Sequence, residues 1–328
     1  MNYQAPWWLP GGHLQTIWAA KLSRIDPDSH SAPPRFARER WDTPDGDFID
    51  VDWLSDADGS PARSETLLVM FHGLEGSSQS HYSRGFAQAA RARGWAFAIP
   101  HFRGCSGELN HAPRAYHSGD HAEIDWILRR LAARSGQAVV AVGISLGGNA
   151  LMRWAGEQGA AAGSTARAVA SVCSPLDLSS SGEAMGRGFN RHVYTRMFLQ
   201  TMKPKALQKL AQHPGLFDRE RLLAAQDLYE FDNVFTAPLH GFRDTDDYWR
   251  RASAKPHLPS IRIPALALNA RNDPFVPAAS LPQRADVSAS LQLWQPAHGG
   301  HVGFALGRWP GHVMAMPDAV CGWLDQSS

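Results

Sequence analysis

The sequence predicts an α/β fold in which a mostly parallel central sheet is flanked by helices and interrupted by a helical lid insertion. Apolar runs without alternation recur along the chain, separated by stretches of helical character, which is typical of parallel strands buried on both faces. The long stretch 179–258 breaks this pattern, because it holds helical patterns such as 194–199 and 206–212 but no further buried strand. We therefore expect one sheet with an all-helical insertion.

Composition indicates a globular protein, either one large domain with an insertion or two ordinary domains. The chain has 328 residues, of which 44% are hydrophobic and 19% charged, and its formal net charge is +1. This balance gives no indication of a nucleic-acid partner. No apolar run approaches the roughly 18 residues that cross a bilayer, and residues 1–8 lack the basic stretch and apolar core of an export signal. We expect a cytoplasmic protein without a transmembrane segment, and the oligomeric state stays open.

Three units are expected along the chain. Residues 1–35 form an N-terminal arm, rich in aromatic residues, Pro and Gly, that packs on the core. Residues 36–178 and 259–328 form the α/β core, and residues 179–258 form the helical lid. Peripheral membrane contact through the arm is left open, but burial of the arm explains its tryptophans more simply; these are Trp7, Trp8 and Trp18.

The elements of the core follow from apolar runs and from turn signals. A turn at Pro44-Asp45-Gly46 predicts a hairpin over 36–54. The other expected elements are, in chain order, strand 66–71, helix 81–93, strand 95–100, a helix through 125–131, strand 138–144, strand 166–173, strand 263–270, strand 290–294 and helix 316–324.

The centre of the sequence is a Gly-x-Ser-x-Gly turn around Ser145, with Gly143 and Gly147 two residues to either side. It follows a Val-rich strand and precedes a helix, which is the context that a nucleophile on a strained strand-to-helix turn requires. Because a helix begins at Leu146, its backbone N–H is free to point at a developing negative charge. A second such donor is expected from the Leu74 backbone N–H, in the glycine-rich loop after strand 66–71.

Two further strand ends supply the partners of a serine nucleophile. Asp273 follows strand 263–270 and His301 follows strand 290–294, which gives the chain order Ser, Asp, His. In that arrangement His301 takes the proton of Ser145 and Asp273 holds the imidazole tautomer. Alternatives remain for the base and for the acid. His298 lies three residues before His301, and Asp177 follows strand 166–173.

The same loops argue against other chemistries. His72 is expected to brace its loop rather than act as the base. No His-Glu-x-x-His metal motif and no dinucleotide motif is present, so we expect neither a metal nor a cofactor. The cysteines, Cys105, Cys173 and Cys321, are too scattered for a disulfide framework, and Cys173 is interpreted as a small core residue.

The motifs together resemble the YheT-type α/β-hydrolase family, a serine esterase and lipase branch. The resemblance covers nearly the whole chain and implies the α/β-hydrolase fold, with Ser145, Asp273 and His301 as its catalytic triad. One departure is Asn272, where the family often has a second Asp. The resembling segments are 10–16, 72–77, 102–107, 116–119, 143–149, 236–242, 272–275 and 299–304.

These residues favour a serine hydrolase that cleaves a carboxylic ester through an acyl-enzyme on Ser145. The aromatic lid predicts a hydrophobic substrate, either a short- to medium-chain acyl ester or a glycerolipid, with Phe231, Asp232 and segment 236–242 at the border of the pocket. Two alternatives stay open. The same triad could cleave a thioester or a peptide, or the chain could be a non-catalytic binding protein on a hydrolase fold.

Overall fold

The structure is a computed structural model, and it describes residues 1–25, 33–55, 64–136 and 138–327. One sheet runs through the molecule, with strand order β1-β2-β4-β3-β5-β6-β7-β8. The pairs β1·β2 and β2·β4 are antiparallel, and all other neighbours are parallel. The strands are β1 (Phe36–Asp42), β2 (Phe48–Leu54), β3 (Thr66–Phe71), β4 (Ala96–Pro100), β5 (Ala138–Ile144), β6 (Ala168–Val172), β7 (Ala265–Leu268) and β8 (Leu291–Trp294).

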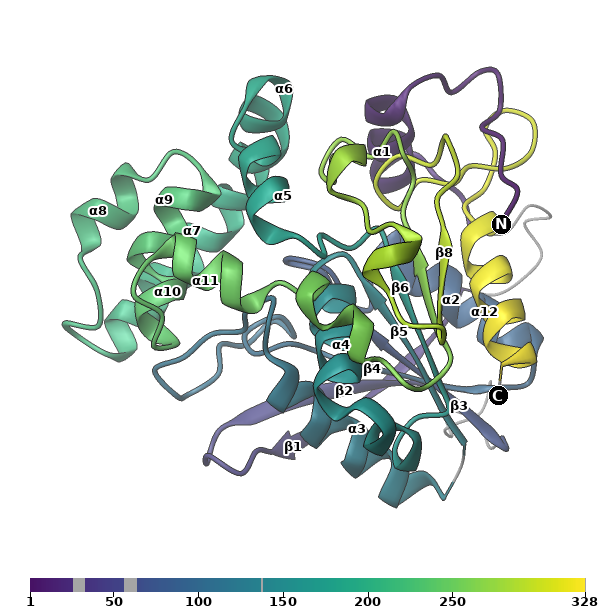
Figure 1. The fold of residues 1–328 in the computed structure, drawn as a ribbon. Helices are drawn as coiled ribbons and strands as arrows, with labels where there is room; N and C mark the ends of the chain where they lie inside the picture. The colour runs from purple at the N-terminus through teal and green to yellow at the C-terminus, as the bar shows by residue number, and fades with distance from the viewer. Residues whose placement is uncertain (26–32, 56–63, 137, 328) are drawn as a thin grey trace.

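Helices cover both faces of the sheet (Figure 1). Side chains alternate along a strand, so that in β3 Leu67 and Val69 belong to one core cluster while Leu68 and Met70 belong to the other. The first cluster packs against α3 (His121–Ser135) and α4 (Leu146–Gln158), and the second against α2 (His81–Ala92) and α12 (Ala315–Gln326). Since both faces are buried, the central strands are almost entirely apolar, with Ser171 in β6 as a buried polar exception, and the predicted α/β sheet is confirmed.

The chain between β6 and β7 is helical and contains no strand, and all of it is described. Most of these helices have apolar clusters of their own, built around Phe231, Phe235 and Trp249, and α7 to α11 lie to the left of the sheet in Figure 1, with α5 and α6 above its centre. They are α5 (Leu178–Met185), α6 (Gly188–Asn190), a π turn (Arg191–Thr195), α7 (Arg196–Gln212), α8 (Arg219–Ala224), α9 (Leu228–Val234), α10 (Thr236–Leu239), α11 (Thr245–Ala252) and a 3-10 turn (Lys255–Ser260).

The N-terminal segment carries α1 (Gly12–Lys21) and packs on the loops near the C-terminus. Leu9, Trp18 and Ala19 share a cluster with Ala305 and Val313. The Tyr3 hydroxyl donates to the Ala305 carbonyl at 2.8 Å. Residues 26–32, at the end of the predicted arm, lie outside the described residues. This packing places α1 directly beside the loop that follows β8.

Some predicted strands are shorter in the structure. The predicted strand 263–270 shortens to Ala265–Leu268, because Pro264 has no N–H to donate to a neighbouring strand. The predicted hairpin over 36–54 is confirmed, with Phe36 opposite Leu54 and Asp42 opposite Phe48. Within the described ranges, no helix has the length and apolarity to cross a membrane.

Asp47, at the hairpin turn, binds the loop that follows β4, and this loop contacts α7 of the insertion. Asp47 accepts hydrogen bonds from Arg103 Nη1 (2.8 Å), Asn110 Nδ2 (2.7 Å) and the backbone N–H of His111 (2.6 Å). Lys209 on α7 donates to the Asn110 carbonyl. Burial alone would raise the pKa of Asp47, but the hydrogen bonds from Asn110 and the backbone outweigh it and lower this pKa to about 2.

We predict that Asp47→Asn lowers the free energy of unfolding by about 2–4 kcal/mol at pH 7, since it replaces a buried acceptor by a group that also donates. A carboxyl with a lowered pKa stabilises the fold above its unfolded pKa of 3.8 and loses that contribution as the pH falls through about 2. The difference between wild type and variant should therefore shrink between pH 4 and pH 2. Urea denaturation at several pH values measures it.

The matched control is Asp42→Asn, which changes an exposed carboxyl of the same hairpin. It should unfold like the wild type at every pH. Equal stability of the Asp47→Asn variant and the wild type at pH 7 would contradict the role assigned to Asp47.

Candidate active site

The turn between β5 and α4 holds Ser145 in a conformation that few residues other than glycine adopt, with φ 52° and ψ −118°. The Ser145 N–H donates to the Val172 carbonyl at 2.8 Å, which ties the turn to β6. A Cβ on Gly143 would lie 2.4 Å from the Gly148 Cα, and one on Gly147 would lie 2.5 Å from the Phe71 carbonyl oxygen. The glycines therefore allow the close approach that puts Ser145 at the tip of the turn.

Ser145, His301 and Asp273 lie in one chain of contacts. His301 Nε2 is 3.1 Å from Ser145 Oγ, and His301 Nδ1 is 2.8 Å from Asp273 Oδ2. The other oxygen of Asp273 accepts the backbone N–H groups of Phe275 at 2.8 Å and Val276 at 3.3 Å. With Nδ1 protonated toward the carboxylate, Nε2 is left free to accept the serine proton.

The N-terminal helix contacts the loops that carry Asp273 and His301. Thr16 Oγ1 accepts the His301 N–H at 2.8 Å, and Gln15 Oε1 accepts the Gly299 N–H at 2.9 Å. Asn272 bridges the two loops: its Nδ2 donates to Gln15 Oε1 and its Oδ1 accepts the Gly300 N–H. Gln15 is fully buried. The sequence analysis did not assign these roles. The feature that could have indicated them is the polar pair Gln15-Thr16 in an arm that is otherwise rich in aromatic residues.

Leu74 and Leu146 lie at the same cavity as Ser145. Both residues line that cavity. Neither amide has a hydrogen-bond acceptor within the described part of the chain, although neighbouring amides do: the Gly73 N–H donates to Tyr82 and the Glu75 N–H to Tyr116. Two unpaired donors beside a serine hydroxyl form the geometry that can hold an oxyanion.

The rival residues lie elsewhere. His298 is exposed, and Asp177 caps α5 by accepting the Ser180 N–H at 3.1 Å. His72 Nδ1 lies 2.8 Å from the Gly73 carbonyl, and its Nε2 accepts the Phe102 N–H at 3.0 Å. Burial lowers the pKa of His72 to about 3, with a smaller contribution from His101. His72 therefore braces two loops as a neutral side chain.

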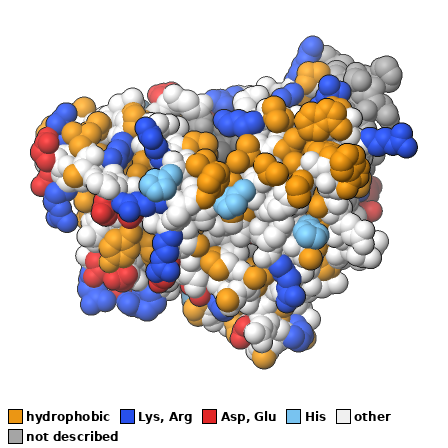
Figure 2. All heavy atoms as spheres, turned by 90° about the horizontal axis from the view of Figure 1, so that it is seen from above, with side chains coloured by type: hydrophobic (Ala, Val, Ile, Leu, Met, Phe, Trp, Pro, Cys, Tyr) orange, Lys and Arg blue, Asp and Glu red, His pale blue; other side chains and the backbone are white. Residues whose placement is uncertain are grey.

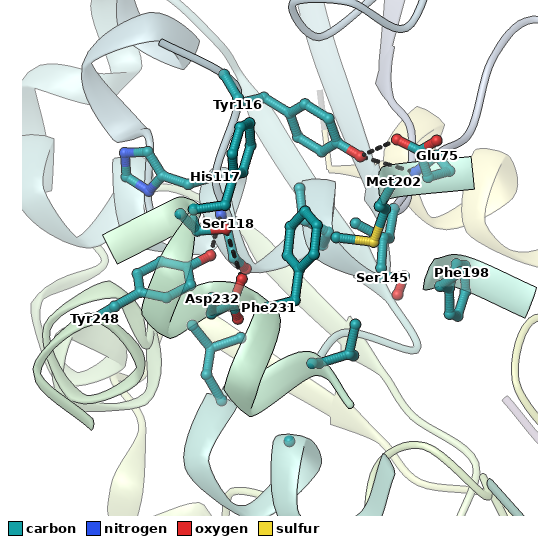
Figure 3. A pocket seen from close by; sticks show the side chains of 18 of the residues that line it. Glu75, Tyr116, His117, Ser118, Ser145, Phe198, Met202, Phe231, Asp232 and Tyr248 are labelled. Carbon is teal, nitrogen blue, oxygen red and sulfur yellow. Dashed lines mark hydrogen bonds between the residues drawn. The ribbon is translucent and has the colours of Figure 1, made fainter. Parts of the chain in front are cut away.

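The cavity next to Ser145 has a volume of about 170 Å³ and a mostly apolar lining. In Figure 3, Phe198, Met202 and Phe231 lie around the space that Ser145 faces. Of the predicted border residues, Phe231 and Asp232 line the cavity, but segment 236–242 contributes only Thr236, because the rest of it packs away from the cavity. The other apolar lining residues of the insertion include Leu178, Met185, Ala206, Leu228, Phe235, Tyr248 and Trp249.

One polar group joins the insertion to the loop after β3. Glu75 follows Leu74, and its carboxylate lies 2.9 Å from Lys205 Nζ on α7. The Tyr116 hydroxyl donates to the same carboxylate at 3.0 Å (Figure 3). An ion pair between the insertion and the core thus lies at the edge of the cavity, directly beside the Leu74 N–H.

A metal could be held by residues of the same site. The ligand atoms of Cys173, Asp273 and His301 all lie within 4.8 Å of one another. Burial and the nearby Asp273 raise the pKa of the Cys173 thiol well above its usual range, whereas a cysteine that binds a metal does so as the thiolate. The sequence analysis interpreted Cys173 as a small core residue. In the structure, Cys173 Sγ also accepts a hydrogen bond from the Val302 N–H at 3.3 Å.

The chain is similar to known proteins over most of its length. A family model described as the α/β hydrolase fold matches residues 66–307. The Escherichia coli (strain K12) protein named "Putative esterase YheT" is 38% identical over 95% of this chain and 89% of its own length. The mouse protein named Phospholipase ABHD3 is 29% identical over 91% of this chain and 74% of its own.

Solved structures share the fold at much lower identity. The Pyrococcus furiosus esterase Pf2001 superposes with a TM-score of 0.56, at 13% identity over 89% of this chain and 93% of that one. From the family match over most of the chain and the identity to YheT, the chain belongs to the α/β-hydrolase family, in its YheT-type branch.

Proposed function

We propose that the protein is a serine hydrolase that cleaves carboxylic esters through an acyl-enzyme on Ser145. The observation that carries the proposal is the unbroken chain of contacts from Ser145 Oγ through His301 to Asp273. The names of the relatives, esterase and phospholipase, support the same class of reaction.

The reaction follows from the positions of the atoms. Ser145 Oγ attacks the ester carbonyl carbon while His301 Nε2 takes its proton. As the carbon–oxygen bond to the alcohol breaks, the imidazolium returns that proton to the leaving oxygen, and Asp273 stabilises the charged ring in between. Water then attacks the acyl-enzyme with His301 as the base, releasing the acid and restoring Ser145.

The Leu74 and Leu146 N–H groups are proposed as the oxyanion hole. Each unpaired donor is worth about 3 kcal/mol of transition-state stabilisation in related arrangements. Their positions on the two sides of Ser145, one after β3 and one at the start of α4, support this role.

The substrate class is proposed from the cavity. Its apolar lining favours an acyl chain, and its volume of about 170 Å³ is close to that of an engineered cavity of about 150 Å³ that admits benzene. We therefore propose a short- to medium-chain acyl ester, with residues 179–258 acting as the lid; a glycerolipid is the second candidate, supported by the names of relatives called phospholipase and monoacylglycerol lipase. A cytoplasmic location is part of the proposal, and the three free, buried cysteines support it.

The first test is hydrolysis of p-nitrophenyl esters from butyrate to palmitate. Ser145→Ala, His301→Ala and Asp273→Asn should each lower kcat by roughly 10³-fold or more, since each removes one member of a unit. The rate should be highest for the shorter chains. Thioesters of coenzyme A and peptides, assayed in parallel, test the alternative bonds.

Two matched controls come from the rival residues. His298→Ala lies three residues from His301, and Asp177→Asn is the same chemical change as Asp273→Asn; both should keep the wild-type kcat. Wild-type activity in Ser145→Ala would overturn the proposal. A wild type that cleaves none of the three substrate types would favour a non-catalytic binding protein.

Chelation tests the metal-binding alternative at the same residues. Because Asp273 and His301 are proposed to act through the hydrogen bond between them, incubation with EDTA or dipicolinate should leave the rate of ester hydrolysis unchanged. Loss of activity that zinc restores would assign Cys173, Asp273 and His301 to a metal centre instead.

A further inference from the structure

Three long segments of the chain contain no acidic residue. They are residues 1–25, 184–217 and 287–317, in a chain that has 31 Asp and Glu among 328 residues. The segments do contain basic residues, among them Lys21, Arg24 and Arg308, all of which are exposed. Two acidic residues that follow the first segment, Asp26 and Asp28, lie outside the described residues. Glu183, which precedes the second segment, is paired with Arg187 at 3.1 Å.

The three segments meet in space. Trp8 packs edge-on against Trp309 at a centroid distance of 5.3 Å, and its Nε1 donates to the Gly307 carbonyl. His13 lies 4.6 Å from the Phe189 ring and 5.8 Å from the Tyr194 ring, between ring centroids. The first segment thus touches both of the others and joins them into one surface.

Large apolar side chains are exposed on this surface. Trp7 is 92% exposed and Trp309 67%, which is far more than an indole ring in a structural role requires. Leu14 and Lys21 are seven residues apart on α1 and so lie on one side of that helix. We call this surface the basic apolar face; its exposed members are Trp7, Leu14, Lys21, Leu22, Arg24, Phe189, Leu306, Arg308 and Trp309.

Figure 2 looks down on the top of the molecule, where Figure 1 places α1 and α6. Hydrophobic side chains gather over its upper right part, with Lys and Arg around them. Acidic side chains are concentrated at the far left and along the lower edge. An exposed apolar area with a basic border marks an interaction surface rather than ordinary solvent-facing side chains.

The face is continuous with the candidate active site. The exposed Phe189 ring packs on Tyr194 at 5.8 Å, Tyr194 packs on Phe275 at 4.6 Å, and Phe275 packs on the His301 ring at 4.2 Å. Tyr194 is buried and Phe275 lines the cavity. Apolar contact therefore runs from the surface to the catalytic base.

We infer that the basic apolar face docks the protein onto an anionic lipid bilayer. Tryptophan rings concentrate at membrane interfaces, where the ring is apolar and the indole N–H stays wet. Each Lys or Arg close to an anionic membrane adds about 1 kcal/mol of attraction. Docking by a few side chains places the protein on the bilayer surface without a spanning helix. A lipid leaving the bilayer at this face would meet the aromatic path to His301.

Sedimentation with lipid vesicles tests the inference. The wild type should bind vesicles that contain phosphatidylglycerol and phosphatidylcholine, and bind much less to phosphatidylcholine alone or at high salt, because screening weakens the charge attraction. The double variants Trp7→Ser/Trp309→Ser and Lys21→Glu/Arg308→Glu should each lower the partition coefficient about tenfold.

The controls separate docking from folding and from catalysis. Leu223→Ser removes a 39% exposed apolar side chain on α8, and Arg262→Glu reverses an exposed charge at the amino end of β7; neither should change vesicle binding. Both double variants should keep the wild-type rate on a soluble butyrate ester. Ser145→Ala should bind vesicles as the wild type does, so docking and ester cleavage can fail independently.

Three results would overturn the inference. The first is that the wild type fails to bind anionic vesicles, and the second is that the double variants bind as well as the wild type. The third is that vesicle binding is absent and the chain forms a dimer that the same substitutions dissociate. The last result would assign the basic apolar face to a second copy of the chain.

Discussion

The structure depends on how closely the backbone of the turn at Ser145 approaches its neighbours. Gly143 and Gly147 pack against backbone atoms at distances that leave no room for a Cβ, and Ser145 itself adopts a positive φ. The turn follows β5, which is paired with β3 on one side and with β6 on the other, and these pairings fix its position. The strained turn in return presents both the Ser145 hydroxyl and the first N–H of α4, so one constraint positions the proposed nucleophile and one of the two proposed oxyanion donors.

The remaining parts of the site come from distant segments that meet above this turn. Asp273 and His301, the proposed acid and base, follow β7 and β8, and the His301 loop is held by Gln15, Thr16 and Asn272 through hydrogen bonds to its backbone. The N-terminal helix is therefore part of the support of the site. The same helix exposes Leu14 and Lys21 on its outer side, which links the proposed membrane contact to the element that holds His301.

The sequence predicted those features that local pattern determines. The Val-rich run before Ser145 and the glycine spacing identified the strand and the turn, and the chain order of Ser145, Asp273 and His301 selected side chains that the fold does bring together. Contacts between segments far apart in the sequence could not be predicted from it. Thr16 and His301, for example, are 285 residues apart, yet Thr16 Oγ1 accepts the His301 N–H. No periodicity indicates which insertion residues line a cavity, so segment 236–242 was assigned to the border when only Thr236 reaches it.

The proposed function requires that His301 activates Ser145, and labelling with a fluorophosphonate probe measures this activation. The probe reacts with a serine only when a base removes the hydroxyl proton. We expect one adduct, located by peptide mass mapping on Ser145, that is formed by the wild type and by His298→Ala but not by His301→Ala. A folded wild-type protein that forms no adduct, or an adduct on Ser145 that persists in His301→Ala, would contradict it.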